Sequence, residues 1–499
     1  MSAKPRGDLK PNTFEFENEA LVSVNGFREY DARWLFEKEI NLLGMQALGL
    51  GLGSYFHDCG IAPKVAVGHD YRSYSLSIKQ ALTLGLLNAG CEVVDIGLAT
   101  TPMSYFAQFA LDCPAVAMVT ASHNENGWTG VKMGAQRPLT FGPDEMIRLK
   151  AIVLGGEARP RPGGSYSRVD NFRDRYLEAV TKDHKLSRPI KVVVACGNGT
   201  AGIVGPQALA RIGAEVIPMD AELDYTFPKY NPNTEDMKML HAMADAVRAN
   251  GAELALGFDG DGDRCGVVDD KGEEIFADKI GVLLARDLSA RHKNAKFVVD
   301  VKSTGLFETD PVLKERGVVT DYWKTGHSYI KRRTAELGAL AGFEKSGHYF
   351  FNPPIGRGYD DGVVAAIAVL EMLDRAGGKT MSGLVAGLPK TWGSPTMAPH
   401  CPDDKKYDVV EALTKEYQGL KERGETVLGQ KIARLIMVNG VRVVLEDGTW
   451  GLVRASSNKP SLVVVVESPT SEANMRAMFK DLDARLSKHP EVGAYDQTI

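Results

Sequence analysis

Three aspartates alternate with glycines in one short loop, and their spacing suits them to hold a metal ion. Asp259, Asp261 and Asp263 follow the apolar run 254–256 after Gly257 and Phe258, so we expect a buried strand that ends in an acidic turn. Carboxylate oxygens bind hard divalent cations such as Mg²⁺ or Ca²⁺, and glycine lets alternate side chains converge. Without a cation, three adjacent carboxylates repel one another. The loop therefore predicts a cation site.

Two other interpretations of this loop are a solvated acidic turn and an EF-hand. An acidic run is also compatible with a solvated turn. An EF-hand requires glycine at the sixth loop position and glutamate at the twelfth, where this chain has Arg264 and Asp270, so an EF-hand is disfavoured. Arg264 instead places a guanidinium, which pairs well with phosphate oxygens, beside the cation site. This combination is typical of phosphoryl-transfer chemistry.

A second candidate is Ser122, in the turn that follows the apolar run 115–119. That run predicts a buried strand. Serine is also a favoured helix N-cap residue, and the residues alone leave this interpretation open. The G-x-S-x-G pattern of serine hydrolases does not occur here. His123, the next residue along the chain, is badly placed to act as a general base for Ser122.

The composition is that of an ordinary globular protein. The chain has 499 residues, of which 44% are hydrophobic and 25% charged, with a formal net charge of -5. This length is enough for several domains with sizeable cores. The slightly acidic balance gives no indication of nucleic-acid binding or of a basic membrane-binding surface.

The cysteines and the apolar runs predict a cytoplasmic protein. The six cysteines are scattered without a C-x-x-C pair, which favours reduced thiols. No apolar run reaches the length of about 20 residues that a membrane span needs, so we expect no membrane partner. Residues 1–20 are polar and lack the apolar core of a signal peptide, so they predict a disordered leader.

Three segments share a pattern in which a β-branched run ends in a polar turn. They are residues 65–70, 192–199 and 297–303. Each is followed by a segment of helix length and then by a second strand, predicted at 93–96, 215–218 and 318–321. The repetition predicts three related α/β modules with mixed, mostly parallel sheets.

The C-terminal part has a different pattern. Runs 441–445 and 450–453 flank an Asp-Gly turn and predict a hairpin, and 462–466 adds a strand. Apolar residues at helical spacing in 475–486 predict a closing helix, so this part is an α+β domain. Proline- and glycine-rich stretches mark linkers. The predicted domains, arranged around a central cleft, are 21–168, 169–273, 274–388 and 389–499.

Four motifs together resemble the α-D-phosphohexomutase family, in particular its bacterial phosphomannomutase/phosphoglucomutase branch. They are T-A-S-H-N with Ser122, D-G-D-G-D-R from Asp259, E-K-S-G-H from Glu344 and R-A-S-S-N from Arg454. They occur in the family's order and near its spacing. In that family the serine carries the transferred phosphoryl group, and the aspartates hold Mg²⁺ against it.

The resemblance implies catalytic and metal-binding roles for particular residues. Ser122 and the three aspartates would hold one Mg²⁺. Lys132 matches a lysine near the phosphoserine, although a lone lysine is more often an ordinary surface residue. Arg33 matches an active-site arginine. His327, in a K-T-G-H-S loop, is a candidate for proton transfer, and a structural histidine is an equally good interpretation. The implied catalytic residues are Ser122, Lys132, Arg33 and His327.

The resemblance also implies how a phosphosugar would be bound. Glu344 and Ser346 would bind the 3- and 4-hydroxyls of the sugar, although Phe343 replaces the family's usual glycine. Arg454 would open a phosphate-binding loop, in which Asn458 stands where the family commonly has threonine. The implied substrate-binding residues are Tyr30, Arg264, Lys302, His327, Glu344, Ser346, His348, Arg454, Ser456, Ser457 and Asn458.

The expected activity is the interconversion of the 1-phospho and 6-phospho forms of mannose or glucose. It would pass through a phosphoserine enzyme and a 1,6-bisphosphosugar, with glucose or mannose 1,6-bisphosphate as activator. The alternatives are a phosphoglucosamine mutase, a serine-phosphate hydrolase and a non-catalytic Ca²⁺-binding protein. The sequence leaves the oligomeric state open between monomer and dimer.

Overall fold

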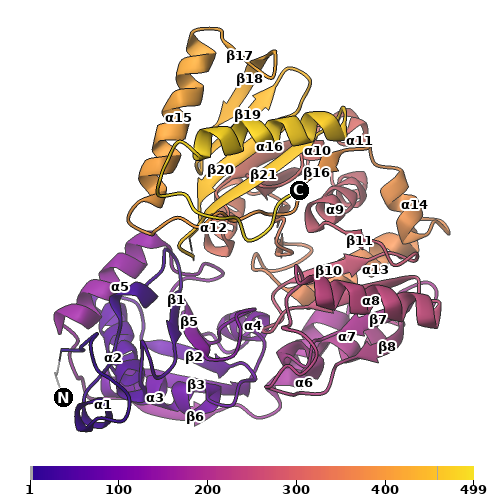
Figure 1. Ribbon diagram of the computed structural model, residues 1–499. Coiled ribbons are helices and arrows are strands. Elements are labelled where there is room, and N and C mark those ends of the chain that lie inside the picture. Colours follow the sequence, from indigo (N-terminus) through magenta and orange to yellow (C-terminus); the bar gives the residue numbers. More distant parts are fainter. Residues whose placement is uncertain (1–3, 458) are drawn as a thin grey trace. The chain divides into compact units, whose positions relative to one another are not determined.

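The computed structural model describes residues 4–457 and 459–499 (Figure 1). The chain forms two compact units. The first contains the chain up to Ala277 and again Ser346–Ser382. The second contains Asp278–Lys345 and Gly383–Ile499. No helix in the described part of the chain combines the length and the apolar character that crossing a membrane requires.

The first unit begins with a mixed sheet. Its strands are β1 (Ala32–Leu35), β2 (Lys64–His69), β3 (Glu92–Leu98), β4 (Ala115–Val119), β5 (Trp128–Gly134) and β6 (Ser165–Arg168). They lie in the order β1-β5-β4-β2-β3-β6. The part β4-β2-β3-β6 is parallel, whereas β5 is antiparallel to both of its neighbours. The valine- and alanine-rich interiors of β2 and β4 are buried, as expected for parallel strands covered on both faces.

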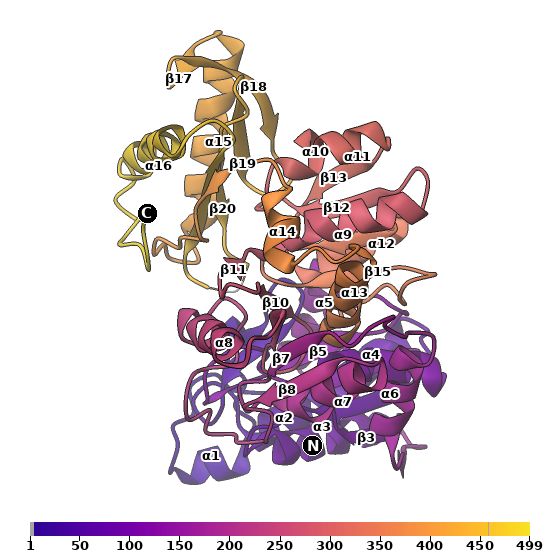
Figure 2. The ribbon, with the colours of Figure 1, turned by 90° about the vertical axis from the view of Figure 1, so that its right-hand side faces the viewer.

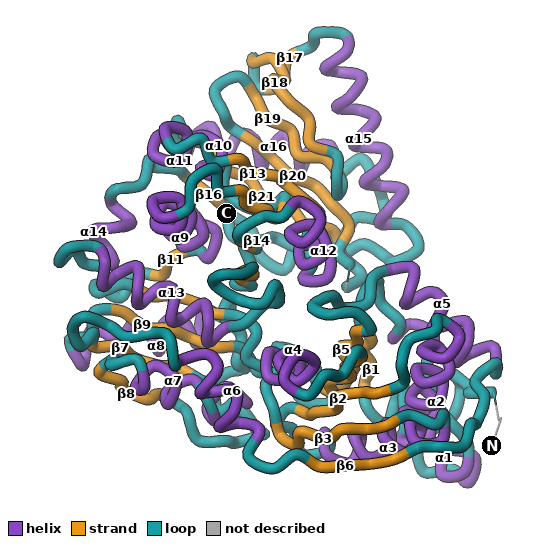
Figure 3. Tube along the Cα trace, turned by 180° about the vertical axis from the view of Figure 1, so that it is seen from behind, coloured by secondary structure: helices purple, strands orange, loops and turns teal. Residues whose placement is uncertain are grey.

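Helices cover both faces of this sheet. The elements are α1 (Phe14–Asn18), η1 (Val24–Gly26), α2 (Leu42–Asp58), α3 (Ser75–Asn88), α4 (Thr101–Ala110) and α5 (Pro143–Gly155). α2 packs against α3 and α5, and Figure 3 shows α4 on the opposite side of the strands. A Cβ atom at Gly49 would lie 2.2 Å from the Leu82 carbonyl oxygen, so the close approach of α2 and α3 requires glycine.

Residues 4–20 differ from the predicted disordered leader. They contain α1, and the Val22 amide donates to the Arg6 carbonyl over 2.8 Å. The side chain of the buried Asn41 donates to the carbonyl oxygens of Phe16 and Glu19, each over 2.9 Å. The segment is therefore held by a side chain outside it. Its own polar composition gave no sign of this interaction.

The second sheet of the first unit is also mixed. Its strands are β7 (Lys191–Ala195), β8 (Glu215–Met219), β9 (Leu254–Phe258), β10 (Cys265–Val268) and β11 (Glu274–Ile275). β7 is parallel to β8 and β9, and β10 turns back antiparallel to β9 and pairs with β11. The accompanying helices are α6 (Phe172–Thr181), η2 (Thr200–Ile203), α7 (Gly205–Arg211) and α8 (Met237–Asn250). The acidic loop 259–264 joins β9 to β10.

The first unit is completed by the returning segment, which contains β15 (Tyr349–Phe351) and α13 (Gly362–Arg375). α13 packs against α7 and β10 (Figure 2). The apolar run 363–370 lies within this helix, and most of its side chains are buried. Its N-cap is Asp361, whose carboxylate accepts from the amides of Val363 and Val364.

The second unit begins with a parallel sheet. Its elements are α9 (Ala277–Arg291), β12 (Lys296–Asp300), α10 (Leu306–Thr309), α11 (Pro311–Glu315), β13 (Val319–Trp323), α12 (His327–Leu337), β14 (Ala341–Phe343) and α14 (Met381–Ala386). β12 lies between β13 and β14 and is parallel to both. This arrangement keeps the apolar interior of β12 away from the sheet edge.

The three modules repeat one strand topology. In each, the first strand lies between the second and the third, giving β4-β2-β3, β9-β7-β8 and β14-β12-β13. All neighbouring pairs in these triplets are parallel. The prediction of three related modules with mostly parallel sheets is therefore confirmed, whereas the exact limits of the four domains stay a prediction.

The C-terminal part of the second unit is an antiparallel sheet with helices on one face (Figure 1). Its elements are β16 (Trp392–Gly393), α15 (Lys406–Glu422), β17 (Thr426–Val427), β18 (Gln430–Ile436), β19 (Val441–Leu445), β20 (Trp450–Ala455), β21 (Leu462–Ser468) and α16 (Glu472–Leu486). The predicted hairpin is β19–β20, and α16 buries the predicted apolar stripe against β20 and β21. The α+β prediction for this part is confirmed.

Arg442 joins this sheet to the preceding module within the second unit. Its guanidinium donates to the carbonyl oxygens of Val301 and Ser303 over 2.9 and 2.6 Å. It also lies over the rings of Trp450 and Tyr322, at 3.6 and 4.5 Å from their centroids. Buried charge-assisted hydrogen bonds of this kind fix the backbone on both sides of residue 302.

Asp361 provides a test of the packing of α13. Its carboxylate caps the helix and also accepts from the Tyr176 hydroxyl, at 2.9 and 3.0 Å from its two oxygens. We expect Asp361→Ala to lower the free energy of unfolding by about 2 kcal/mol, because a cap and a buried hydrogen bond are lost. Asp361→Asn is the matched control, since asparagine caps equally well. Urea denaturation measures both; equal losses would contradict the capping argument.

The same residue predicts a pH dependence. Burial raises the pKa of Asp361 to about 6, so the folded protein retains this proton where the unfolded chain has lost it. The stability that this group contributes is complete below the unfolded pKa and falls as the pH rises through about 6. Asp361→Asn cannot ionise. Its stability relative to the wild type should therefore rise between about pH 4 and about pH 6 and stay constant above that.

Candidate active site

Ser122 lies in a turn with an unusual backbone conformation. The turn follows β4, and the next element is β5, so Ser122 is not a helix N-cap and that interpretation was wrong. Ser122 has a φ of 54°, a left-handed value that is uncommon for residues other than glycine, and its side chain is buried. Such strain persists only where surrounding contacts hold it, and it is concentrated at functional sites.

The three aspartates converge in the loop between β9 and β10. Asp259, Asp261 and Asp263 are each 0% exposed, and one oxygen of each lies within 4.8 Å of the others. The Ser122 hydroxyl donates to Asp259 over 3.4 Å. A Cβ atom at Gly260 would lie 2.5 Å from the Ser122 carbonyl oxygen, so the contact between the two loops requires glycine there.

Lys132, on β5, supplies positive charge to this cluster. Its ammonium group contacts Asp261 over 2.8 Å and Asp263 at closer range. Lys132 is only 2% exposed, so the interpretation as a surface lysine was wrong. Thr101, at the start of α4, donates to the same carboxylate of Asp261 over 2.5 Å.

The electrostatics of the cluster differ from one aspartate to the next. Burial, together with the charges of Asp263 and Asp261, raises the pKa of Asp259 well above its usual range. Burial also disfavours ionised Asp261, but the adjacent Lys132 outweighs this and lowers the pKa of Asp261. The cluster thus has more negative charge than one lysine offsets, and this imbalance favours an additional cation.

The donor set fits a hard divalent cation. Oδ1 of Asp261 and Oδ1 of Asp263 are buried and accept no hydrogen bond from any residue that the structure describes. Buried carboxylate oxygens without donors are costly, and a cation satisfies them. Mg²⁺ and Ca²⁺ are the ions that prefer such oxygen ligands.

Arg33, on β1, lies close to the Ser122 turn. It forms a buried ion pair with Asp31 at 2.9 Å, and it donates to the Thr120 carbonyl over 3.4 Å. Tyr30, which precedes β1, is also buried. The guanidinium is therefore held beside the turn by a carboxylate that the sequence analysis did not identify.

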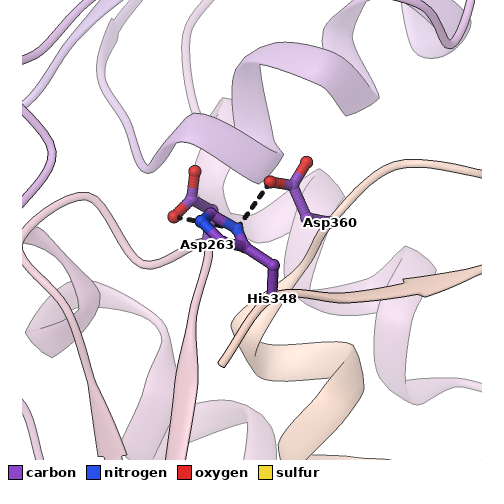
Figure 4. Close-up of side chains that lie close together, drawn as sticks. All are labelled: Asp263, His348 and Asp360. Atoms are coloured by element: carbon purple, nitrogen blue, oxygen red, sulfur yellow. Dashed lines mark ion pairs between the residues drawn. The ribbon is translucent and has the colours of Figure 1, made fainter. Parts of the chain in front are cut away.

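His348 lies between Asp263 and Asp360 (Figure 4), and Arg264 contacts its other ring nitrogen. Arg264 Nε donates to His348 Nε2 over 3.0 Å. His348 Nδ1 lies 2.8 Å from Asp360 and 3.7 Å from Asp263. Because Nε2 accepts, the ring proton lies on Nδ1 and faces the two carboxylates. Arg264 Nε is also 3.8 Å from Asp259, so these contacts extend from Asp360 to the acidic loop 259–264.

The second unit brings a different group of predicted residues together. Glu344 follows β14 and accepts from the Gly326 amide over 2.9 Å, so the E-K-S-G-H and K-T-G-H-S loops are in contact. His327 begins α12 next to that amide. Lys302 lies 3.8 Å from Asp300, at the end of β12. Ser346 belongs to the first unit, where its carbonyl accepts from a threonine hydroxyl over 3.3 Å.

The predicted phosphate loop follows β20. Arg454 lies near the end of β20, and its guanidinium donates to the Ala455 carbonyl over 2.8 Å. Ser456 and Ser457 are buried, whereas Asn458 lies outside the described residues. Lys406, which the sequence analysis missed, donates to the Ser456 carbonyl over 2.5 Å. The loop is thereby anchored to the start of α15.

Family models match four consecutive parts of the chain. Those for phosphoglucomutase/phosphomannomutase α/β/α domains I, II and III match residues 24–159, 174–272 and 276–392. The model of the family's C-terminal domain matches residues 400–484. The chain belongs to the phosphoglucomutase/phosphomannomutase family.

Individual relatives support this membership over almost the whole length. A phosphomannomutase/phosphoglucomutase of Pseudomonas putida is 34% identical over 442 residues, which is 89% of this chain and 91% of the relative. A phosphoglucomutase of Neisseria gonorrhoeae is 32% identical over 457 residues, covering 91% and 95%. The crystal structure of a family protein from Burkholderia thailandensis aligns with a TM-score of 0.83 at 30% identity, covering 94% of this chain and 98% of that one.

Several residues that shape the site were not singled out from the sequence. Asp31 lies next to Tyr30 in the stretch 26–33, which resembles the family's opening motif, but no role was predicted for it or for Thr101. Asp360 had a weak signal, since Asp360 and Asp361 immediately precede an apolar helix and look like capping residues. Only the fold shows that one of the two faces His348 and the other caps α13.

Lys132 tests the charge balance of the aspartate cluster. We expect Lys132→Met to lower the melting temperature, because loss of one partner of a buried ion pair costs about 3–5 kcal/mol. Added Mg²⁺ should restore more stability to this variant than to the wild type, since the cation replaces the missing positive charge. Differential scanning fluorimetry with and without Mg²⁺ measures this.

The matched control is Lys79→Met. Lys79 is also 2% exposed and forms a buried ion pair with Asp95, but no described contact links it to the aspartate loop. This variant should be destabilised without any enlarged response to Mg²⁺. Equal responses in the two variants would contradict the proposed cation site.

Proposed function

We propose that this protein interconverts the 1-phospho and 6-phospho forms of mannose and glucose. The main observation that supports this proposal is the position of Ser122. It lies in a strained turn, and its hydroxyl is directed at Asp259 of the buried aspartate cluster. Membership of the phosphoglucomutase/phosphomannomutase family supports a mutase, which is an isomerase that moves a phosphoryl group within one sugar.

The proposed reaction has two transfers with Ser122 as carrier. In the first, a sugar hydroxyl attacks the phosphorus of phosphorylated Ser122, the bond from phosphorus to the serine oxygen breaks, and a 1,6-bisphosphosugar forms. In the second, the Ser122 hydroxyl attacks the other phosphate of that intermediate. Each transfer moves one proton from the attacking hydroxyl to the leaving oxygen, so atoms and charge balance over the cycle.

Basic side chains near Ser122 are suited to stabilise the transferring group. Lys132 and Arg33 approach the turn from the first sheet, and Arg264 approaches from the aspartate loop. Fixed positive charge where phosphoryl charge develops is the main source of catalysis in such reactions. We assign proton transfer to His327, whose ordinary pKa lies near neutrality.

We propose that Asp259, Asp261 and Asp263 hold one Mg²⁺ together with the phosphate on Ser122. The ion supplies charge neutralisation to the phosphoryl oxygens. Two buried carboxylate oxygens without donors support this assignment. We also propose glucose or mannose 1,6-bisphosphate as the activator, because a bisphosphosugar that reaches unphosphorylated Ser122 would restore the phosphoserine.

The sugar and its distal phosphate are assigned to other loops. Glu344 and Ser346 would bind the 3- and 4-hydroxyls, which glucose and mannose share, so both orientations of the intermediate can be held. The distal phosphate is assigned to the loop that begins at Arg454. The proposed substrate-binding residues are Tyr30, Arg264, Lys302, His327, Glu344, Ser346, His348, Arg454, Ser456, Ser457 and Asn458.

Location and assembly are part of the proposal. All six cysteines are free thiols, the state expected in the reducing cytoplasm, where we place the protein. A phosphosugar is the proposed partner, and nucleic acid is not. Both a monomer and a dimer are compatible with the proposed reaction, which uses residues of a single chain.

Replacing Ser122 tests the carrier role. We expect Ser122→Ala to lower mutase activity by about 10³-fold or more, with an unchanged melting temperature, because the nucleophile is lost while the turn keeps its packing. Ser54→Ala is the matched control, since both serines are 3% exposed and Ser54 lies on α2. Intact-protein mass should show a phosphate on the wild type that Ser122→Ala lacks. A protein that is active without Ser122 would overturn the mechanism.

Parallel assays with three substrates test the sugar class. We expect mannose 1-phosphate and glucose 1-phosphate to be converted with kcat/KM values at least about 10-fold above that of glucosamine 1-phosphate. Dominant turnover of the amino sugar would instead assign the protein as a phosphoglucosamine mutase. Release of inorganic phosphate in every turnover would identify a hydrolase. Ca²⁺ binding without turnover of any sugar would identify a binding protein.

A further inference from the structure

We propose that Asp70 and Arg72 are positioning residues that hold the Ser122 turn in its left-handed conformation. They lie just beyond the end of β2, the parallel neighbour of β4. This inference rests on the proposed function, because it explains how Ser122 is presented for phosphoryl transfer. Neither residue touches the sugar in the proposed assignment; both act through the backbone of the turn.

Arg72 binds the carbonyl side of the turn. Its Nη2 donates to the Ser122 carbonyl over 3.0 Å and to the Asn124 carbonyl over 2.8 Å. One guanidinium nitrogen therefore fixes two carbonyl oxygens that lie two residues apart. Only 1% of the Arg72 side chain is exposed, so water does not compete for these charge-assisted hydrogen bonds.

Asp70 binds the amide side of the same turn. Its Oδ2 accepts from the Thr120 hydroxyl over 2.8 Å and from the Ala121 amide over 3.2 Å, and it pairs with Arg72 Nη1. The Thr120 hydroxyl in turn accepts from the Ser122 amide over 2.8 Å. The pair Asp70–Arg72 thus contacts the backbone before, at and after Ser122.

The remaining backbone groups of the turn are held from other directions. The Thr120 amide donates to the Gly130 carbonyl, the Asn124 amide donates to the Ala121 carbonyl, and Asn231 donates to the His123 carbonyl. Buried backbone groups need such partners. Within this set, the Ser122 carbonyl depends on Arg72 for its hydrogen bond. Without the Arg72 hydrogen bond, the Ser122 carbonyl would be buried without a donor, which favours rotation of the strained peptide toward another donor.

Arg72 itself has little freedom to move. Its guanidinium is fixed by Asp70 and lies over the ring of Phe227, 5.6 Å from the centroid. Asp70 is fixed at its other oxygen by the Ser75 hydroxyl, which donates over 2.6 Å at the start of α3. Because Asp70 and Arg72 are themselves fixed by the first module, they restrict the movement of the turn. Preorganisation of this kind matters because displacement of a reacting atom by about 1 Å can cost about 100-fold in rate.

The test compares Arg72→Met and Arg72→Lys in the full-length protein. We expect Arg72→Met to lower kcat by about 30-fold or more, with KM for glucose 1-phosphate within about threefold of wild type. Arg72→Lys should recover part of kcat, because a single ammonium nitrogen keeps the positive charge but cannot pair with Asp70 while it also holds both carbonyls, as the two guanidinium nitrogens do. The same order should appear in the rate at which glucose 1,6-bisphosphate phosphorylates Ser122, followed by intact-protein mass.

Lys79→Met separates positioning from general loss of stability. Lys79 is equally buried in the same module, and its ion pair with Asp95 has no described contact with the turn. It should lower the melting temperature while leaving kcat and the phosphorylation rate of Ser122 within about twofold of wild type.

The outcomes separate this inference from the proposed function. An active wild type whose Arg72→Lys and Arg72→Met variants keep kcat and the phosphorylation rate would overturn the positioning role alone. A rise in KM without a change in kcat would overturn it too, because Arg72 would then serve substrate binding. If Arg72→Met does not fold, kcat and the Ser122 phosphorylation rate of Arg72→Lys test the positioning role in its place. A wild type that turns over no phosphosugar would overturn the proposed function itself.

Discussion

Three buried carboxylates that lie within 4.8 Å of one another impose the constraint on which the rest of the site depends. Their mutual repulsion has to be offset, and Lys132 is the nearest positive charge. Lys132 belongs to the first sheet, whereas the aspartates belong to the second. The electrostatic requirement therefore couples the two modules, because Lys132 reaches Asp261 and Asp263 from the first sheet.

The repeated topology of the modules explains where the chemistry occurs. The third strand of each parallel triplet ends in a loop that carries a predicted functional residue, namely Ser122 after β4, Asp259 after β9 and Glu344 after β14. Loops at the carboxyl ends of parallel strands are the usual location of binding sites in α/β folds. The first strand of a triplet ends beside the third. Asp70 and Arg72 after β2 are thereby adjacent to the Ser122 turn.

Stability and function are linked through the turn at Ser122. Its left-handed backbone is unfavourable by itself. It is maintained by hydrogen bonds that Arg72 and Asn231 donate, by one that Asp70 accepts, and by the close approach of Gly260. These contacts come from β2, from the second module and from the aspartate loop. The turn is therefore the meeting point of structural elements that are far apart in the sequence, and it keeps one conformation because they all restrict it.

The sequence by itself determined where the main strands lie and which types of side chain the candidate site contains. Apolar runs with β-branched residues placed β2, β4, β7, β9 and β12, and the D-G-D-G-D spacing identified the aspartate loop, because these signals are local. Only the tertiary structure decided which distant residues share an environment. The contacts of Lys132 with Asp261, of Arg264 with His348 and of Arg72 with Ser122 join residues that are 129, 84 and 50 positions apart. No local pattern encodes such contacts, because they arise when strands from separate segments align in the sheets.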